Sequence, residues 1–416
     1  MRTSARAAVA VAAVMLMVAA GCSSSSKSSG GGSSASGGGK TITVGVLTDL
    51  TGLASTNSVT FPLGVKAGVG LAAKEGYTIK YDVVDTTSSP ASALSGAQKL
   101  VDQDHVFAVL GSSALLFSAA PFLASKGVPV VGVAIDSTEW ITDRNMFSVL
   151  GTQDYSKVYS QFGLFYKLVG ATNLGSVGYS ISPSSADSAK AIALSAQDAG
   201  LKVGYLNASF PFGGTNVGPA VLAMKSAGID AFSGSIQTNT EFAMITGLRQ
   251  QGVNLKAPLL ATGYGGDLTS GGPGAEQAAQ GVYFLTAYQP VEMNTSATQQ
   301  LQSALSTYAG VKGLPTFAEY NGYASVDALV QGLKAAGSNP TQASFINAML
   351  AITNYNAAGL YGSHSVSFAL ADRGQASGPD NCYYVVQYKG TTFNLVSGAD
   401  PICGAVIPGK TVSSSS

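Results

Sequence analysis

Residues 106–138 read VFAVLGSSALLFSAAPFLASKGVPVVGVAIDST, and their pattern decides the fold class. The apolar run at 106–110 is typical of a strand buried on both faces of a parallel sheet. Apolar residues then recur at helical spacing over 114–126, and a second apolar run follows at 128–133. The stretch therefore predicts a strand, a helix and a second strand that lies parallel to the first.

Both turns of this unit follow the carboxyl ends of parallel strands. Open α/β sheets bind their ligands at that edge, where the turns leave polar groups and free backbone N–H groups. The residues of the two turns that meet this description are Ser112, Ser113, Ile135 and Asp136. We expect these four residues to contact a ligand.

The alternation of strands and helices continues on both sides of this stretch. Before it we expect strands at 41–47 and 78–84 and helices at 61–74 and 90–102. After a strand at 146–150, a second series comprises helices at about 154–169, 185–199, 215–227 and 239–251 and strands at 174–180, 201–207, 229–234, 257–261 and 282–285. Two such series predict an α/β fold of two doubly wound lobes with mostly parallel sheets.

The last third of the chain has a different pattern. Helices are expected at 295–308, 316–336 and 341–350, and short antiparallel strands at 366–368, 382–388 and 391–396. These elements include too few strands for a third lobe, so they must complete the two lobes already described. The chain then crosses between the lobes more than once, which predicts a hinge.

Composition excludes several classes of function. The 416 residues include 22 basic and 22 acidic side chains, a net charge of zero that offers no electrostatic surface for nucleic acid. Motifs of hydrolases, nucleotide-binding loops and zinc proteases are missing, so we expect no catalytic residue and no cofactor. The two histidines, His105 and His364, are far apart in the sequence, and no metal site is expected.

The N-terminal segment predicts export. Residues 1–21 combine two arginines, an apolar run and small residues, as in a secretory signal peptide. Residues 18–22, VAAGC, resemble a bacterial lipobox, so Cys22 is expected to carry the lipid of a lipoprotein. The alternative is an ordinary signal peptide that contains a cysteine. Residues 22–40 are mainly Ser and Gly and predict a flexible linker at the outer face of the cell membrane.

Two further cysteines lie near the C-terminus. In an exported protein, a pair such as Cys382 and Cys403 is most simply a disulfide. It would close a loop in the C-terminal part of the chain.

Four phrases of the sequence resemble a known family in their order and spacing. They are VGVLTDLTG at 44–52, DTTSSPASALSGAQKLVDQDHVFAVLGS at 85–112, KGVPVVGVAIDSTEW at 126–140 and FAEYNGYASVDALVQGLKAAG at 317–337. Together they are similar to the type I solute-binding proteins of ABC transporters, and most of all to the branched-chain amino acid (leucine/isoleucine/valine)-binding group. The resemblance extends over about residues 41–400.

The resemblance implies a domain organisation and a function. Two Rossmann-like lobes would be joined by a hinge of three crossovers, with lobe one at 41–149 and 287–355, lobe two at 150–286 and 356–408, and a disordered tail at 409–416. The chain would bind a small polar or amphipathic solute, amino acid-like or carboxylate-bearing, between its lobes. It would work as a monomer and deliver the solute to the permease subunits of an ABC transporter.

The resemblance also assigns the carboxylate of the solute to lobe one. In this chain the matching turn and helix contain Ser112, Ser113 and Ser118, which could hold an anion together with free backbone N–H groups. The alternative for Ser113 is a helix cap. The next turn, with Ile135 and Asp136, would contact the amine of the solute.

Two departures from the family affect the amine. Family members place an acid from lobe two opposite the ammonium, but the matching turn at 261–265 contains none. The tyrosine expected after the strand at 174–180 is also replaced, by a turn that includes Ser185. An unpaired ammonium in a closed site would be costly. Either Asp136 or Asp267 therefore supplies the charge, or the solute has no ammonium.

Aromatic residues are candidates for an apolar part of the solute. Phe117, Tyr264 and Tyr320 would reach it if they face the cleft, whereas the alternative is that they belong to the core. Gln237 follows the strand at 229–234 and would offer its amide from lobe two.

Two other functions stay open at this point. A sensory module of the same fold would bind a ligand and report it to a separate partner. A hydrolytic enzyme on a similar scaffold would need a catalytic set that the sequence does not display.

Overall fold

The computed structural model describes residues 41–134 and 138–412. The predicted signal peptide, Cys22, the linker, Ile135 and Asp136 lie outside the described residues. Within these two ranges, no helix combines the length and the apolar character that a membrane span requires.

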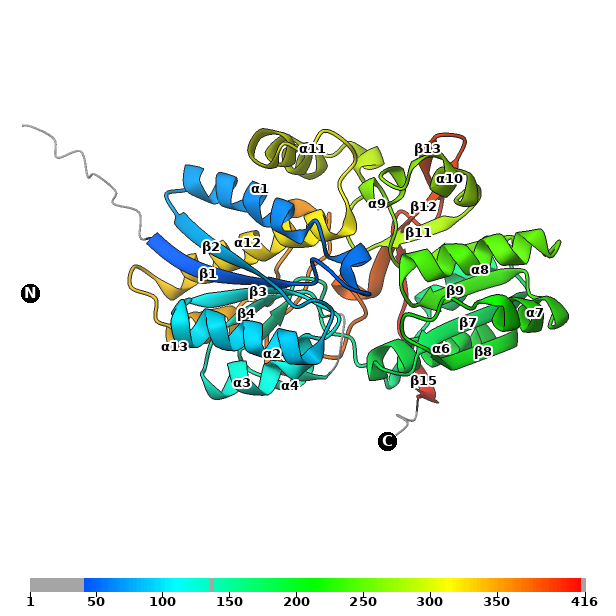
Figure 1. Cartoon of the computed structure of the whole chain (residues 1–416), viewed down its shortest axis with the longest axis horizontal. Helices are drawn as coiled ribbons and strands as arrows, with labels where there is room; N and C mark the ends of the chain where they lie inside the picture. Colours follow the sequence, from blue (N-terminus) through cyan, green and yellow to red (C-terminus); the bar gives the residue numbers. More distant parts are fainter. Residues whose placement is uncertain (1–40, 135–137, 413–416) are drawn as a thin grey trace, which may run out of the picture. The chain divides into compact units, whose positions relative to one another are not determined.

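The first sheet is entirely parallel, with the strand order β2-β1-β3-β4-β5. Its strands are β1 (Thr41–Thr48), β2 (Thr78–Asp85), β3 (Ala108–Ser112), β4 (Val130–Gly132) and β5 (Met146–Ser148). Figure 1 shows α1 and α12 on one face of this sheet and α2 and α3 on the other. The helices of this part are α1 (Phe61–Lys74), α2 (Pro90–Gln98), α3 (Ala120–Ser125), α4 (Glu139–Thr142), α11 (Ser296–Ala304), α12 (Phe317–Ala336) and α13 (Gln342–Leu350).

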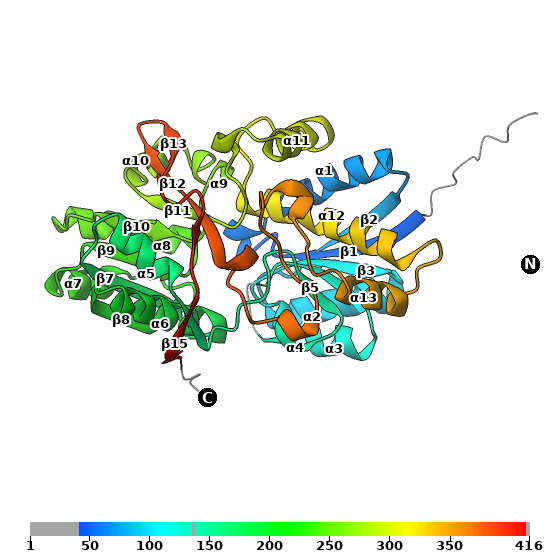
Figure 2. The same ribbon diagram turned by 180° about the vertical axis from the view of Figure 1, so that it is seen from behind.

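The second sheet repeats this order in its parallel part, β8-β7-β9-β10-β11. Its strands are β7 (Asn173–Tyr179), β8 (Lys202–Phe210), β9 (Ala231–Ser235), β10 (Ala257–Leu260) and β11 (Tyr283–Thr286), followed by the antiparallel β12 (Cys382–Lys389), β13 (Thr392–Leu395) and β14 (Ile402–Cys403). Figure 2 shows β12 and β13 beside β11 at the edge of this sheet. Its helices are α5 (Gln161–Leu168), α6 (Pro183–Asp198), α7 (Gly218–Ser226), α8 (Thr238–Gln250), α9 (Gly266–Thr269) and α10 (Gly272–Ala278).

Helices α1 and α12 pack closely against each other on one face of the first sheet. A Cβ atom on Gly64 would collide with the carbonyl oxygen of Glu319, and one on Gly322 with the carbonyl oxygen of Phe61. Two glycines therefore let the helix backbones approach each other directly. A capping box, in which Thr316 and Glu319 bond each other's backbone N–H groups, starts α12 at this contact.

The chain passes between the two sheets three times, after β5, after β11 and before β12. The third passage comes later in the chain than residue 355, at which lobe one was expected to end. Phe368 packs edge-on against Phe147, and the guanidinium of Arg373 donates to the carbonyl oxygens of Trp140 and Asp143. We therefore propose that lobe one extends beyond 355 and that the return to lobe two follows Arg373.

Three predicted elements differ from the structure. The helix expected at 114–126 begins only at Ala120, after a short turn of 3-10 helix at Leu116–Ser118, because Pro121 lacks an N–H and fits only the first turn. The helix expected at 154–169 begins only at Gln161, because β6 (Lys157–Tyr159) occupies part of that range and pairs with β15 (Val406–Thr411). The expected strand at 366–368 is reduced to a single bridge between Val366 and Tyr355.

The predicted tail at 409–416 also begins inside a strand. Residues 409–411 belong to β15, and the Val412 backbone N–H donates to the carbonyl oxygen of Ser156. Pairing with β6 orders this segment, which the sequence alone could not reveal because its partner lies some 250 residues away.

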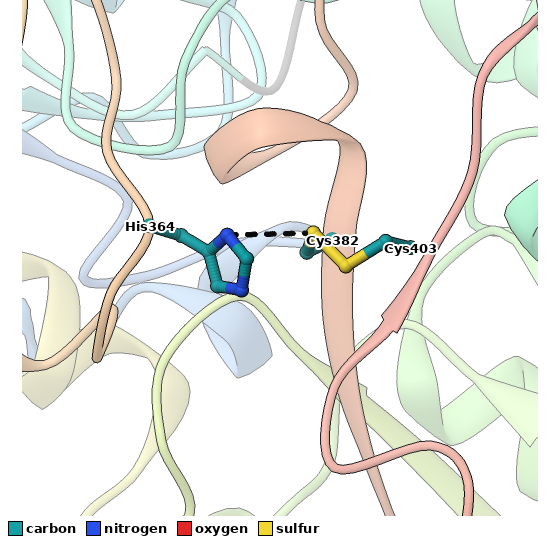
Figure 3. Close-up of side chains that lie close together, drawn as sticks. All are labelled: His364, Cys382 and Cys403. Atoms are coloured by element: carbon teal, nitrogen blue, oxygen red, sulfur yellow. Dashed lines mark hydrogen bonds between the residues drawn. A yellow bond between two sulfur atoms is a disulfide. The ribbon is translucent and has the colours of Figure 1, made fainter.

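The expected disulfide joins Cys382 and Cys403, which are paired across β12 and β14, with the sulfur atoms 2.02 Å apart. Figure 3 shows the imidazole of His364 beside this bond, with Nδ1 3.6 Å from Sγ of Cys382. All three potential ligand atoms lie within 4.8 Å of one another. While the sulfurs are bonded to each other, neither is the thiolate that a metal requires. The group is a disulfide with a neighbouring imidazole.

Candidate functional site

A cavity of about 200 Å³ lies at the carboxyl ends of strands from both sheets. In each sheet the strand order reverses at one point, between β1 and β3 in the first and between β7 and β9 in the second. The first sheet contributes Ala54, Asn57 and Ser58 after β1, and Ala114 and Leu115 after β3. The second contributes residues after β7, β9 and β10. The cavity thus occupies the switch points at which doubly wound sheets bind ligands.

The wall from the second sheet is rich in hydroxyl groups. Its polar residues are Ser182, Ser184, Ser185, Ser188, Ser235, Gln237 and Thr262, together with Tyr155 and Tyr179. Among the described lining residues none is charged. A solute must therefore find hydrogen-bond partners here rather than an opposite side-chain charge.

Two helices begin at this wall. Ser182 caps α6 and its Oγ accepts the Ser185 backbone N–H at 3.3 Å, while Pro183 occupies the first turn and contributes a preset φ. Gln237 occupies the N-cap position of α8. The caps of both helices line the cavity.

The two turns are tied to each other by backbone and side-chain hydrogen bonds. The Ser185 hydroxyl donates to the carbonyl oxygen of Ser235 and accepts the Tyr179 backbone N–H at 2.7 Å. The backbone N–H of Gln237 donates to the phenolic oxygen of Tyr179 at 3.1 Å. The floor of the cavity is therefore held in place before any solute arrives.

Aromatic rings form an apolar side of the cavity. Tyr179 and Phe212 meet edge to face, with ring centroids 5.2 Å apart, and both line the cavity with Tyr155, Ile181 and Ile236. Burial raises the pKa of the Tyr179 phenol, so it stays neutral at physiological pH. The wall from the second sheet thus offers apolar rings as well as hydroxyl and amide groups.

One hydrogen bond joins the two walls. The Thr238 hydroxyl donates to Oδ1 of Asn57 at 3.0 Å, from α8 to the turn after β1. The two walls therefore touch at the cavity, and a solute inside it would contact both.

The sequence model of one family matches residues 41–392, and its description is periplasmic binding protein. The match includes most of the chain. This chain belongs to the periplasmic binding protein family. Its members are binding proteins, and membership implies a place outside the cytoplasmic membrane. The resemblance of the four sequence phrases is thereby confirmed.

Solved structures of similar fold support the assignment of two lobes. A leucine-binding protein from Thermotoga maritima has a TM-score of 0.68 at 18% identity, covering 86% of this chain and 98% of that one. A solute-binding protein of an ABC transporter from Rhodopseudomonas palustris, in complex with 3,4-dihydroxybenzoic acid, has a TM-score of 0.71 at 17% identity, with 89% and 99% covered.

A third similar structure binds an amino acid. The branched-chain amino acid transporter substrate-binding protein from Streptococcus pneumoniae, in complex with isoleucine, has a TM-score of 0.69 at 17% identity, with 88% and 99% covered. At these identities the similarity shows the fold alone. No curated protein matches the sequence.

Of the predicted site residues in this periplasmic binding protein, Ser185 and Gln237 lie at the cavity. Ser112 and Ser113 are fully buried behind it. The Ser113 hydroxyl donates to Oδ1 of Asp49 at 2.7 Å, and the Ser112 hydroxyl lies 3.4 Å from that of Ser58. Their hydroxyl groups therefore already have partners within the protein.

Asp49 organises the turn after β3. Its carboxylate accepts the Ser113 hydroxyl, the Thr86 hydroxyl and the Ala114 backbone N–H, the last at 3.0 Å. Burial raises the pKa of Asp49, and the hydrogen bonds from Thr86 and Ser113 oppose that rise. This network positions Ala114 and Leu115 at the cavity.

Four other predicted site residues do not line the cavity, as far as the described residues define its lining. Ser118 donates to the carbonyl oxygens of Leu115 and Pro90, and Phe117 is partly buried in the same turn. The Tyr264 hydroxyl donates to Oε2 of Glu292 at 2.5 Å, and the Tyr320 ring stacks on Tyr288 with centroids 5.3 Å apart. Tyr264 and Tyr320 are core residues.

Asp267 is one of the two acids that were considered as a partner for an ammonium of the solute. Its Oδ2 accepts the Phe317 backbone N–H at 2.8 Å, at the start of α12, and it does not line the cavity in the described part of the chain. Burial raises the pKa of Asp267 to about 7. Asp136, which lies outside the described residues, remains a candidate for pairing with an ammonium.

The sequence interpretation missed the residues after β1 and the last residue of β7. Asn57 and Ser58 belong to the switch point, but the strand order that makes them neighbours of the site is not visible in a sequence. Tyr179 ends β7, three residues before Ser182, where the turn in which a tyrosine was expected begins. Its place at the end of an apolar run was the available signal.

A larger depression of about 680 Å³ lies between α7 and α8. It is lined by residues of these helices and the segment before α7, including Val221, Leu222 and Phe242. Because all of its lining belongs to one lobe, a ligand there would not connect the two sheets.

Proposed function

We propose that this chain is an extracytoplasmic solute receptor that binds one small amphipathic solute and delivers it to the permease of an ABC transporter. The observation that carries the proposal is the cavity at the switch points of both sheets. A solute that contacts both walls favours the arrangement in which they are together, which is the event that a permease can sense.

The size and chemistry of the cavity support a small solute. Its volume, about 200 Å³, lies below the ~300–1,000 Å³ typical of drug-sized ligands. The aromatic rings suit a branched or aromatic group, and the hydroxyl groups suit a carboxylate. Similar structures bind isoleucine and 3,4-dihydroxybenzoic acid, and both solutes combine these two features.

We further propose that the mature chain is a monomeric lipoprotein anchored through Cys22. The lipobox-like residues 18–22 and the Ser/Gly-rich linker support this part of the proposal. Metabolic labelling with a fatty acid should mark the wild-type chain but not Cys22→Ala.

Native mass spectrometry tests the receptor function directly. The mature chain is mixed with a panel of branched-chain and aromatic amino acids, hydroxybenzoates, their amides and short-chain carboxylates. We expect one molecule of at least one panel member to bind each chain and to be lost on denaturation. Failure of every member to bind would contradict the proposed function.

A further inference from the structure

We propose that the chain in its reduced form binds one Zn²⁺ ion through Cys382, Cys403, His364 and Asp380, and that formation of the disulfide releases the ion. The four residues lie beside β12 and β14, and they do not line the described solute cavity. The inference is therefore independent of the identity of the solute. Three features of this region carry it.

The first feature is the number of ligand atoms in one place. Sγ of Cys382, Sγ of Cys403 and Nδ1 of His364 lie within 4.8 Å of one another (Figure 3). Zinc sites in proteins are built from thiolates, imidazoles and carboxylates. Oδ2 of Asp380 lies 3.5 Å from the same Nδ1 and completes a set of four ligands. The residue types thus match a tetrahedral zinc site.

The second feature is the spacing of these atoms. In a tetrahedral zinc site, an imidazole nitrogen lies roughly 3.5 Å from a thiolate sulfur and roughly 3.4 Å from a carboxylate oxygen. The corresponding distances from Nδ1 of His364 are 3.6 Å to Sγ of Cys382 and 3.5 Å to Oδ2 of Asp380. A neutral imidazole with its proton on Nε2 would present Nδ1 to the ion. The orientation of the ring therefore already suits a shared ion.

The third feature is the support of the ligands. β12 and β14 hold the two cysteines opposite each other, with Cα atoms 4.0 Å apart. The Ser365 backbone N–H donates to Oδ2 of Asp380 at 2.9 Å. Cys382 is buried, whereas Cys403 and the Asp380 carboxylate are exposed, so an ion can enter from the solvent. Reduction frees the exposed Cys403 side chain to rotate, so that both sulfurs can bind one ion.

A dithiol reductant converts the disulfide form into the metal-binding form. It breaks the bond between Cys382 and Cys403, transfers two electrons to their sulfur atoms and itself becomes a disulfide. The protons of the two new protein thiols are released when Zn²⁺ binds the sulfurs as thiolates. In the reverse direction, an oxidising disulfide takes two electrons from the thiolates and becomes two thiols with protons from water. The bond between the cysteines forms again, and Zn²⁺ leaves with its charge unchanged.

Zinc binding by the reduced and the oxidised chain tests the proposal. All proteins carry Cys22→Ala, so that Cys382 and Cys403 are the only cysteines. The untagged chain is reduced with a phosphine, freed of reductant under nitrogen and titrated with ZnCl₂ by calorimetry. The oxidised chain is titrated in parallel. CoCl₂ replaces zinc in a second titration, in which thiolate ligation produces a charge-transfer absorption band.

The variants remove single ligands without removing the disulfide. His364→Ala should weaken zinc binding by the reduced chain at least about tenfold, because loss of even an outer-shell partner has an effect of this size. Asp380→Asn should also weaken binding, and an unchanged affinity would overturn the assignment of Asp380. His105→Ala, an exposed histidine of the first lobe, is the control and should bind zinc like the parent.

We expect one Zn²⁺ per reduced chain, a cobalt–thiolate band, and neither in the oxidised chain. Equal zinc binding by the two forms, or undiminished binding by His364→Ala, would overturn the proposal. Circular dichroism shows whether the reduced chain stays folded. A reduced chain that unfolds and that zinc does not refold would also contradict the proposal, because ligands from separate segments meet only in the folded chain.

Discussion

Asp49 determines what the serines of the first sheet can do. Its buried carboxylate accepts the Ser113 hydroxyl, so this side chain supports the turn on which Ala114 and Leu115 meet the cavity. A hydroxyl that already satisfies a buried carboxylate has little left for a solute. The family's carboxylate site on this turn thus depends on a group that this chain uses internally.

Ser113→Ala should lower the free energy of unfolding by about 1–3 kcal/mol, because a buried charged acceptor loses a donor. Ser118→Ala, whose hydroxyl donates only to backbone carbonyls in a partly buried turn, should cost less than about 1 kcal/mol. Urea unfolding measures both. A stable Ser113→Ala protein with tenfold weaker solute binding would return Ser113 to the ligand site.

Asp267 predicts a dependence of stability on pH. Burial raises its pKa from 3.8 to about 7, so the folded state holds the proton more tightly than the unfolded state does. Its contribution to stability is complete below pH 3.8 and is lost as the pH rises through about 7.

Asp267→Asn keeps an acceptor for the Phe317 N–H and removes the titration. Between about pH 4 and about pH 8 the variant should lose less unfolding free energy than the wild type. The exposed Asp198→Asn is the control and should follow the wild type. Identical pH profiles for all three proteins would refute this role of Asp267.

Among the elements, the contact between α1 and α12 depends on two glycines. Gly322→Ala would push a methyl group into the backbone of α1 and should cost about 1–3 kcal/mol of unfolding free energy. Gly274→Ala in α10 meets no atom within 4 Å and should gain up to about 1 kcal/mol. Thermal and urea unfolding of both variants test this contrast, and equal effects would show that the approach is not tight.

Local signals explain which elements the sequence predicted well. The helix over 61–74 matches α1 because Pro62 and Lys74 mark its two ends. The predicted start of the helix over 114–126 was wrong because the prediction did not consider that Pro121 fits only the first turn of a helix. β6 and β15 were missed because each depends on a partner far away in the sequence.

The residues of the candidate site also fall into two groups, those that a local signal predicts and those whose position depends on distant parts of the chain. Ser185 and Gln237 were predicted from the polar turns that come after two apolar strands, which is a local signal. Asn57 and Ser58 were not, since their place at the cavity depends on β1 lying beside β3. Tyr264 and Tyr320 occupy the core, because burial at this depth is decided by packing between distant elements.

At the scale of the whole molecule, two sheets of the same strand order share one cavity at their switch points. This arrangement explains why a solute can be held by polar turns from both sheets without a charged side chain among the described lining residues. We therefore expect binding and a change of the two lobes to be coupled at the cavity, and not at the depression between α7 and α8.

Ala261 offers a direct test, because it lines the cavity at an exposed turn after β10. Ala261→Trp should fill the cavity without disturbing the core, and Ala223→Trp on the exposed side of α7 is its control. The measurement is the melting temperature of the wild type and both variants with each solute that binds the wild type. At a hundredfold its Kd, such a solute adds about 2.7 kcal/mol to stability. We predict a rise in melting temperature for the wild type and Ala223→Trp and none for Ala261→Trp; an equal rise in Ala261→Trp would contradict binding in this cavity.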